Sequence, residues 1–373
     1  VEFEREDLAS ELIRAVDDAS KASSIRFVRL SPDREGLSLE LRTLSPTFSP
    51  RRGSDAAHVL FLGLTGAWEQ CLSRLIVALQ DRADETPIVT VVLDPDEQAR
   101  FARWRSTRPE LPLAARFVIL PKGEDLLPAP ESIFGREGLP APQLAIIMRE
   151  DAEGIATALA ARRSDSGLPK DLPILVRQSR EDRLLGRLSA AVDGSPSAGR
   201  TFVPFGGLLR EESVHRLLDR AGDRHAIALH AAYLENARDL GVDNPHVLET
   251  WEALPETFRE ANRSAAAHLP VLSAALAKRA DSATGSDPAT LSEAEALELA
   301  RIEHRRWCAD RIDQGWRHGV ERDDSERIHP SLVAWEALSD RDRRKDVNAV
   351  ETLLRSAAAA ESAPPRPTAG GNR

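Results

Sequence analysis

Five short apolar runs constrain the fold of this chain more than any other feature of its sequence. They lie at residues 58–62, 88–93, 117–120, 144–148 and 172–176. Runs this short and this uniformly apolar are typical of strands buried on both faces, and helical patterns separate several of them. This alternation predicts an α/β fold with a doubly wound parallel sheet, of the Rossmann type, over residues 55–210.

The segments around this sheet are less regular. Residues 1–54 predict an N-terminal helix at 1–21, then short strands at 25–30 and 37–41 around the turn Ser31-Pro32-Asp33. Passages rich in Pro and Gly at 121–142 and 195–207 predict excursions over the sheet and at its end.

Helical patterns replace the strands beyond Arg210. The small, polar residues of 279–291 predict a linker, and Ser292 with Glu295 has the spacing of a capping box that starts the next helix. The Ala, Pro and Gly content of 356–373 predicts a disordered tail.

The helical half contains two diverged copies of one module. The first copy contains, in order, His230-Ala-Ala-Tyr233, Trp251-Glu-Ala-Leu254 and Asn262. The second contains His304-Arg-Arg-Trp307, Trp335-Glu-Ala-Leu338 and Asp346. The step from Trp to the last polar residue is 11 in both (262−251, 346−335), whereas the offset between copies grows from 74 (304−230) to 84 (335−251). The pattern predicts halves at 211–278 and 292–355, the second with a longer middle around 316–329.

The second copy carries the candidate ligand-binding residues. His304, Trp307 and Arg311 recur at intervals of three and four, so they share one face of a helix, and the loop Gly315-Trp316-Arg317-His318-Gly319 follows. Aromatic faces can stack a planar ring, and Arg can pair with phosphate. Taken singly, His304, Trp307 and Trp335 are better explained as core positions, and it is their combination with Arg311 and the Gly-Trp loop that favours ligand binding. The candidate set is His304, Trp307, Arg311, Trp316, Arg317, His329 and Trp335, with Tyr233 from the first copy.

These same residues resemble a known family. Glu303-His-Arg-Arg-Trp-Cys, Gly315-Trp316, His329-Pro-Ser-Leu332 and Trp335-Glu-Ala-Leu, ending in Asp346, are similar to the RyR domain, the repeat named after ryanodine-receptor channels and also found in bacterial proteins. Residues 225–272 resemble its partner half, but with Tyr233 in place of Trp307 and without the Gly-Trp loop. The resemblance implies a compact, mostly α-helical duplicated domain that binds a small ligand, such as a nucleotide, and regulates another protein.

The loop after the first predicted strand is a candidate cofactor site. Gly63-Leu-Thr65-Gly66-Ala-Trp68 stands where dinucleotide-binding domains have three glycines that let a pyrophosphate approach a helix N-terminus. Thr65 and Trp68 would crowd that ligand. Asp94, after the second strand, either holds a ribose or caps the helix from Pro95. An NAD- or ATP-like nucleotide bound by Gly63, Thr65, Gly66 and Asp94 is one interpretation, and a degenerate, structural Rossmann domain is favoured slightly over it.

The order of strands and helices, including Arg149-Glu-Asp151 before a helix, resembles the RCK or KTN domain of potassium-channel and transporter regulators. Such domains occur fused to RyR modules in bacteria. This resemblance implies an upstream membrane channel or transporter segment as a partner, and a homodimer.

Composition excludes several classes. A net charge of −10 without a basic arm argues against nucleic acid. Cys71 and Cys308 are too few for a disulfide framework or a thiolate metal site, and we expect buried thiols in a reducing cytoplasm. No apolar run approaches the ~18 residues of a membrane span. The chain starts at Val1, which is compatible with the cytoplasmic part of a longer membrane protein. No catalytic or metal-binding motif is present, so no catalytic residue and no metal ligand is predicted.

Two functional hypotheses follow. The first is a non-catalytic sensor whose RyR-type module binds a small molecule and transmits its presence to an effector such as an ion channel or transporter. The second is a nucleotide-using enzyme, a hydrolase or NAD-dependent, acting in the Rossmann half.

Overall fold

The computed structural model of this chain describes residues 31–51, 56–124, 126–128, 133, 139–163, 165–179, 202–206, 223–239, 249–280 and 291–362. The predicted helix at 1–21, the strand at 25–30 and most of the predicted linker lie outside these residues. The chain divides into two compact units that interleave in sequence. The first comprises Val1–His215 with Arg301–Ser339, and the second comprises Arg216–Ala300 with Asp340–Arg373.

The first unit is built on a six-stranded parallel sheet. Its strands are β1 (His58–Leu62), β2 (Ile88–Leu93), β3 (Arg116–Pro121), β4 (Leu144–Ile147), β5 (Ile174–Arg177) and β6 (Phe202–Phe205). They are arranged in the order β3-β2-β1-β4-β5-β6, and every neighbouring pair is parallel. This is the strand order of doubly wound dinucleotide-binding folds, in which the order reverses between β1 and β4. The predicted parallel α/β sheet is therefore confirmed, and all five apolar runs form strands.

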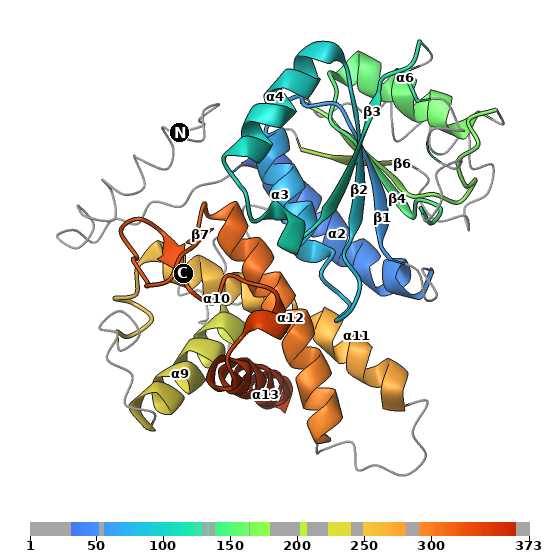
Figure 1. Cartoon of the computed structure of the whole chain (residues 1–373). Coiled ribbons are helices and arrows are strands. Elements are labelled where there is room, and N and C mark those ends of the chain that lie inside the picture. Colours follow the sequence, from blue (N-terminus) through green and yellow to red (C-terminus); the bar gives the residue numbers. More distant parts are fainter. Residues whose placement is uncertain are drawn as a thin grey trace, which may run out of the picture. The chain divides into compact units, whose positions relative to one another are not determined.

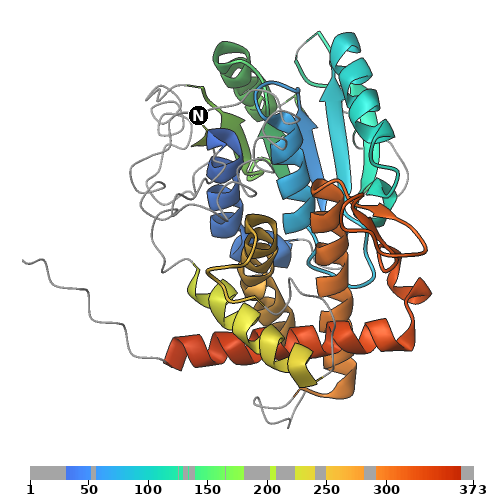
Figure 2. The same ribbon diagram turned by 90° about the vertical axis from the view of Figure 1, so that its left-hand side faces the viewer.

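Helices cover both faces of this sheet. Helices α2 (Pro32–Arg51), α3 (Trp68–Ala78) and α4 (Pro95–Ser106) pack on one face, and α6 (Asp151–Arg162) packs on the other (Figure 1). Figure 2 shows α2 and α3, the two blue helices, side by side. Strand residues alternate between the layers, so Phe61 faces α3 whereas Leu60 faces the α6 side. Because both faces are covered, β1 is buried along its whole length, as its sequence requires.

Two sequence predictions about the first unit are wrong. Residues 37–41, predicted as a strand, belong to helix α2. The alternating Leu37, Leu39 and Leu41 suggested a period of two, but the leucines packed in the core are Leu37, Leu41 and Leu44, which have helical spacing. The second error is strand β6, which lies in the Pro- and Gly-rich passage 195–207. Its Pro204 is tolerated because β6 is an edge strand, where a missing N–H leaves no ladder bond unmade.

Part of the second repeat copy packs into the same unit. Helix α12 (Glu293–Asp313) is followed by the short paired strands β7 (Arg317–His318) and β8 (Ile328–His329) and the 3₁₀ turn η3 (Trp335–Ala337). Cys308, Ala309, Ile312 and Leu332 are buried in the same apolar cluster as α3 and α4. Arg305 donates hydrogen bonds to the side chains of Gln80 and Thr86, both at 3.3 Å.

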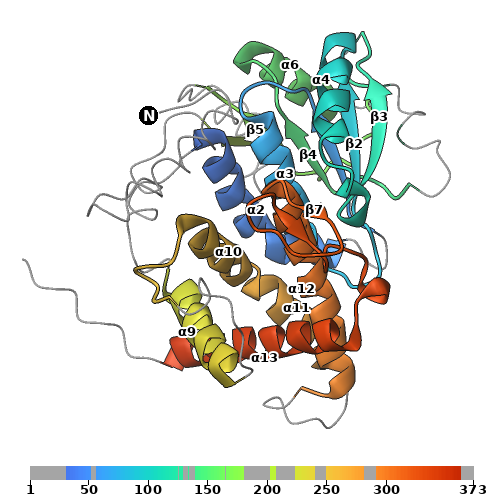
Figure 3. The ribbon, with the colours of Figure 1, turned by 60° about the vertical axis from the view of Figure 1, so that its left-hand side comes forward.

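The second unit contains helices α9 (Arg224–Asp239), α10 (Glu256–Ala267), α11 (Leu269–Ala280) and α13 (Asp340–Ser362). Helix α9 contacts both α10 and α13 (Figure 3). The capping box predicted at the start of α12 is confirmed: Ser292 N–H donates to Glu295 Oε2 at 2.8 Å, and Glu295 N–H donates to Ser292 Oγ at 3.3 Å. The predicted disordered tail begins too early, because α13 continues through residue 362.

Candidate functional site

Four side chains of the second copy converge beside the end of α12. The His329 ring meets Trp307 edge-on at 4.9 Å between centroids and Trp316 at 6.1 Å. The Arg311 guanidinium carbon lies 5.7 Å from the Trp307 ring centroid and 5.2 Å from that of Trp316. All four side chains are partly buried. We call Trp307, Arg311, Trp316 and His329 the tryptophan–arginine cluster.

Helix termination explains how Trp316 reaches this cluster. Gly315 adopts φ +78°, a conformation that favours glycine, and ends α12. The Trp316 N–H then donates to the Arg311 carbonyl at 2.9 Å. The chain therefore folds back on its own last turn, which brings the Trp316 indole against the Arg311 side chain. Gly315 and Trp316 are therefore adjacent because the glycine ends the helix and lets the next residue turn back onto it.

Arg311 has no carboxylate partner at ion-pair distance among the described residues. Its Nη1 donates to the neutral Gln314 Oε1 at 2.8 Å. Burial lowers the pKa of Arg311, although Asp310 nearby opposes the shift. A guanidinium stays protonated even so. It is therefore a desolvated cation between two indoles.

A buried ionic network holds Arg311 in place. Arg306 pairs with Glu303 at 2.8 Å, and both side chains are nearly inaccessible to solvent. Burial alone would lower the pKa of Arg306, but Glu303 and Asp310 outweigh it and raise that pKa. Asp310 accepts a hydrogen bond from Gln314 Nε2 at 3.0 Å, and Gln314 in turn accepts from Arg311. Glu303 therefore pairs with Arg306, and Asp310 accepts a hydrogen bond from Gln314.

His304 and Trp335, two further predicted ligand residues, are core residues. They are 3% and 7% exposed. His304 stacks on Trp307 at 5.8 Å, and its Nε2 donates to the Val333 carbonyl at 2.9 Å. The His304 ring therefore packs against Trp307 of the cluster, and the Trp335 ring packs against His304.

The other predicted ligand residues are placed differently. His329 Nδ1 accepts a hydrogen bond from Ser331 N–H at 3.1 Å, so His329 fixes its turn as well as joining the cluster. Arg317 is exposed on β7. Tyr233 belongs to the second unit, on α9, and is 48% exposed.

The first copy repeats the local geometry of the second. His230 Nε2 donates to the Glu249 carbonyl at 2.8 Å, and Glu249 precedes Trp251 by two residues, just as Val333 precedes Trp335. In each copy the histidine ring lies about 6 Å from the tryptophan ring, at 6.1 Å and 5.8 Å. A helix begins five residues after each tryptophan (256−251 and 340−335). The two sequence copies therefore share a structural motif.

The copies differ at the position of Arg311. Arg311 lies seven residues after His304, whereas Ala237 lies seven residues after His230, so the first copy has no counterpart of this arginine. A different arginine of the first copy, Arg263, lies 5.7 Å from the Trp251 ring and is paired with Asp223 at 2.7 Å.

Three backbone N–H groups of the glycine loop after β1 donate hydrogen bonds to acceptors of the protein itself. Leu64 N–H donates to Glu97 Oε1 at 2.7 Å, Thr65 N–H to the Met148 carbonyl at 2.9 Å and Ala67 N–H to Asp33 Oδ2 at 3.1 Å. These are backbone donors that would face a pyrophosphate in a dinucleotide site. As folded, they have protein acceptors.

Asp33 is the residue that sequence reasoning missed here. It comes from α2 and is paired with Arg177, at the end of β5, at 2.8 Å. A side chain at Gly66, which has φ +63°, would collide with this pair. Asp33 and Arg177 are 144 residues apart in sequence, so no local signal could have identified them.

Asp94 caps helix α4. Its Oδ1 accepts from Glu97 N–H at 2.8 Å, and Glu97 Oε2 accepts from Asp94 N–H at 3.0 Å. The capping alternative for Asp94 is thus shown. The Asp94-x-x-Glu97 spacing was a readable signal for it. Glu97 also ties this helix to the glycine loop through Leu64.

Hydrogen-bond donors remain at the reversal point of the sheet. Arg149 lies two residues after the end of β4, is 2% exposed and pairs with Glu153 at 2.9 Å. Its Nε and Nη2 have no acceptor among the described residues. Cofactor binding at Gly63, Thr65, Gly66 and Asp94 remains a prediction, and the Arg149 side chain, which lies against Gly63, carries donors that could serve an anion there.

Cys71 and Cys308 are both buried, as predicted, and burial raises the pKa of the Cys71 thiol. Within the described ranges, no helix combines the length and the apolar character needed to cross a membrane.

The second copy matches a known protein family. A family model described as RyR domain matches residues 290–362, a range that contains the tryptophan–arginine cluster, the buried network and α13. The match confirms the RyR resemblance for this segment of the chain.

Proposed function

We propose that this protein is a non-catalytic ligand sensor that binds a small planar anion, of the nucleotide type, at the tryptophan–arginine cluster. The single observation that carries this proposal is that Arg311 lies between two indoles with no carboxylate at ion-pair distance among the described residues. An anionic ligand would neutralise the charge of Arg311, and its ring could pack on the partly buried faces of Trp307 or Trp316.

The contrast between the copies supports this choice of site. The second copy has Arg311 seven residues after its histidine, whereas the first copy has Ala237 at that position. Two copies with the same histidine–tryptophan motif thus differ at the position where a ligand anion would act. In this proposal the first copy completes the fold and the second binds.

The proposal includes a route for the signal. Cys308, Ala309 and Ile312 share α12 with Arg311 and are buried against the helices of the parallel sheet. A ligand that repositions Arg311 would act on a helix that is part of the α/β core. We assign this α/β part to the RCK/KTN class, supported by its strand order, and its effector to an ion channel or transporter.

Calorimetry and thermal unfolding with ATP, ADP-ribose, NAD and cyclic nucleotides test the proposal. We expect at least one to bind and to be recovered unchanged by chromatography. Arg311→Gln should weaken it about tenfold or more, because a charge-assisted contact is lost. Arg263→Gln, which removes an arginine beside the tryptophan of the first copy, is the control and should leave the affinity within about twofold.

Trp316→Leu provides a second variant if Arg311→Gln disturbs folding, which circular dichroism would reveal. The proposal fails if no nucleotide binds at millimolar concentration, or if Arg311→Gln and Arg263→Gln weaken binding equally. Recovery of a product instead of the intact ligand would favour the nucleotide-using enzyme.

A further inference from the structure

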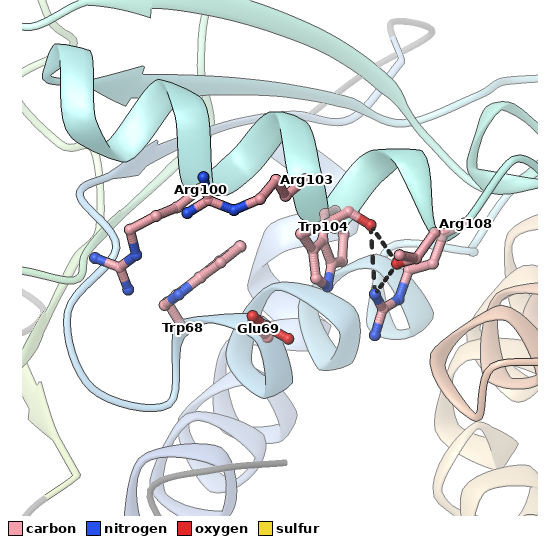
Figure 4. A pocket seen from close by; sticks show the side chains of 7 residues that line it. Trp68, Glu69, Arg100, Arg103, Trp104 and Arg108 are labelled. Atoms are coloured by element: carbon pink, nitrogen blue, oxygen red, sulfur yellow. Dashed lines mark hydrogen bonds between the residues drawn. The ribbon is translucent and has the colours of Figure 1, made fainter. Parts of the chain in front are cut away.

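A second concentration of uncompensated positive charge lies in a pocket between α3 and α4. The cavity has a volume of about 340 Å³. Arg100, Arg103 and Arg108 line it, and Glu69 is the one acidic residue in its lining. In Figure 4 Arg100 and Arg103 lie on the same side as Trp68, and Arg108 lies beside Trp104. None of these residues belongs to the tryptophan–arginine cluster.

The donors of this pocket lack anionic partners. Arg100 Nη2 donates to the Leu64 carbonyl at 3.0 Å, and Arg108 Nη1 donates to the Thr107 hydroxyl at 3.0 Å. Across the described ranges, no carboxylate pairs with any of the three arginines. Arg108 Nε and the indole Nε1 of Trp104 are buried without an acceptor. Buried donors in this state cost free energy that a bound acceptor would recover.

Aromatic packing makes this arrangement rigid. Trp68 and Trp104 are 3% and 4% exposed, and their rings meet edge-on at 5.7 Å. Phe101 stacks on Trp104 at 5.6 Å. The Arg108 guanidinium lies 4.9 Å from the Trp104 ring centroid. The indoles and the Arg108 guanidinium are therefore held in place by packing, so a ligand would not have to order these groups on binding.

We propose that this pocket binds a phosphate ester of mononucleotide size. Paired guanidinium groups suit the oxygens of a phosphate, and the Glu69 carboxylate can accept hydrogen bonds from ligand hydroxyl groups such as those of a ribose. The volume lies near the lower end of the range for small-molecule sites, about 300–1,000 Å³, which favours a mononucleotide over a dinucleotide.

Titration of the full chain with AMP, followed by calorimetry, tests this site, with adenosine and inorganic phosphate as partial ligands. Arg103 is exposed and has no contact that folding requires, so Arg103→Gln should preserve the fold. We expect it to weaken AMP binding at least about tenfold. Arg105→Gln is the matched control, because Arg105 lies on the same helix but packs on Phe101 and Phe117 at 6.0 and 5.6 Å, outside the pocket. It should change the affinity by less than about twofold.

The site is independent of the proposed sensor site, and one variant separates the two. In Arg311→Gln protein, AMP binding that depends on Arg103 should persist. Equal weakening by Arg103→Gln and Arg105→Gln would overturn the pocket, because it would show a general charge effect. Absence of AMP binding at millimolar concentration, or adenosine binding as tightly as AMP, would overturn it as well. None of these outcomes depends on whether Arg311 binds a ligand.

Discussion

The ion pair of Asp33 and Arg177 controls the loop that would bind a dinucleotide in a related fold. Asp33 Oδ2 accepts hydrogen bonds from both Arg177 Nε and the Ala67 N–H at the start of α3. A carboxylate near a helix N-terminus interacts favourably with the helix dipole, as a bound phosphate would. The protein therefore supplies its own anion at this position.

We expect Asp33→Ala to lower the free energy of unfolding by about 3–5 kcal/mol, because it leaves the nearly buried Arg177 charge uncompensated. The double variant Asp33→Ala with Arg177→Met should recover much of the loss, since both charges are then absent. Urea unfolding of the single and double variants measures both effects. A loss below about 1 kcal/mol for Asp33→Ala would mean that the pair behaves like a surface ion pair.

The N-terminus of helix α4 is fixed by a capping box, and later residues of the helix line the pocket. Its N-terminus is fixed by the reciprocal bonds of Asp94 and Glu97. Arg100 and Arg103, about two to three turns further along α4, line the pocket, and Arg108 lines it just beyond the end of the helix at Ser106. A helix whose first turn is anchored in this way holds its later side chains in a defined register.

Asp94→Ala should lower the free energy of unfolding by about 1 kcal/mol, because a cap bond to the Glu97 N–H is lost. Asp96→Ala, an exposed change on the same turn, is the control and should cost less. Denaturant unfolding compares the two. If Asp94→Ala left stability unchanged but abolished NAD binding, the ribose interpretation of Asp94 would be correct instead.

At the scale of the whole molecule, the compact units do not follow the order of the repeat halves. Residues 301–339 of the second copy belong to the α/β unit, whereas α13 belongs to the other. Cys308, Ala309, Ile312 and Leu332 are at most 3% exposed within the α/β cluster. Burial of a side chain as large as Ile312 or Leu332 stabilises by about 1.5–3 kcal/mol, and a domain has only about 5–15 kcal/mol in total.

A chain ending at residue 289 should therefore lose cooperative unfolding of its α/β part and bind a hydrophobic dye such as ANS. Calorimetry and dye fluorescence measure this. Ile312→Ala in the full chain serves as a milder control, with an expected loss of about 2–5 kcal/mol. A truncated chain that unfolded at the temperature of the full protein would show that the α/β part folds without the RyR segment.

The sequence alone determined features that depend on neighbouring residues. Five of the six strands were predictable because a strand buried on both faces must be apolar throughout. Capping by Ser292 and Asp94 was readable from spacing, and so was the shared face of His304, Trp307 and Arg311, because helical periodicity is local. The repeat was visible because each copy conserves one histidine–tryptophan contact.

Tertiary structure decided the rest, since it depends on contacts between distant residues. Leu37, Leu39 and Leu41 alternate like a strand, and only packing against the sheet made them helical. Burial alone separated His304 and Trp335 from the partly exposed cluster, although all carry the same types of side chain. Asp33 could meet Arg177, and Arg311 could remain without a counter-ion, only once the chain had folded. An ion pair between residues so far apart in sequence leaves no periodic pattern that sequence analysis could detect.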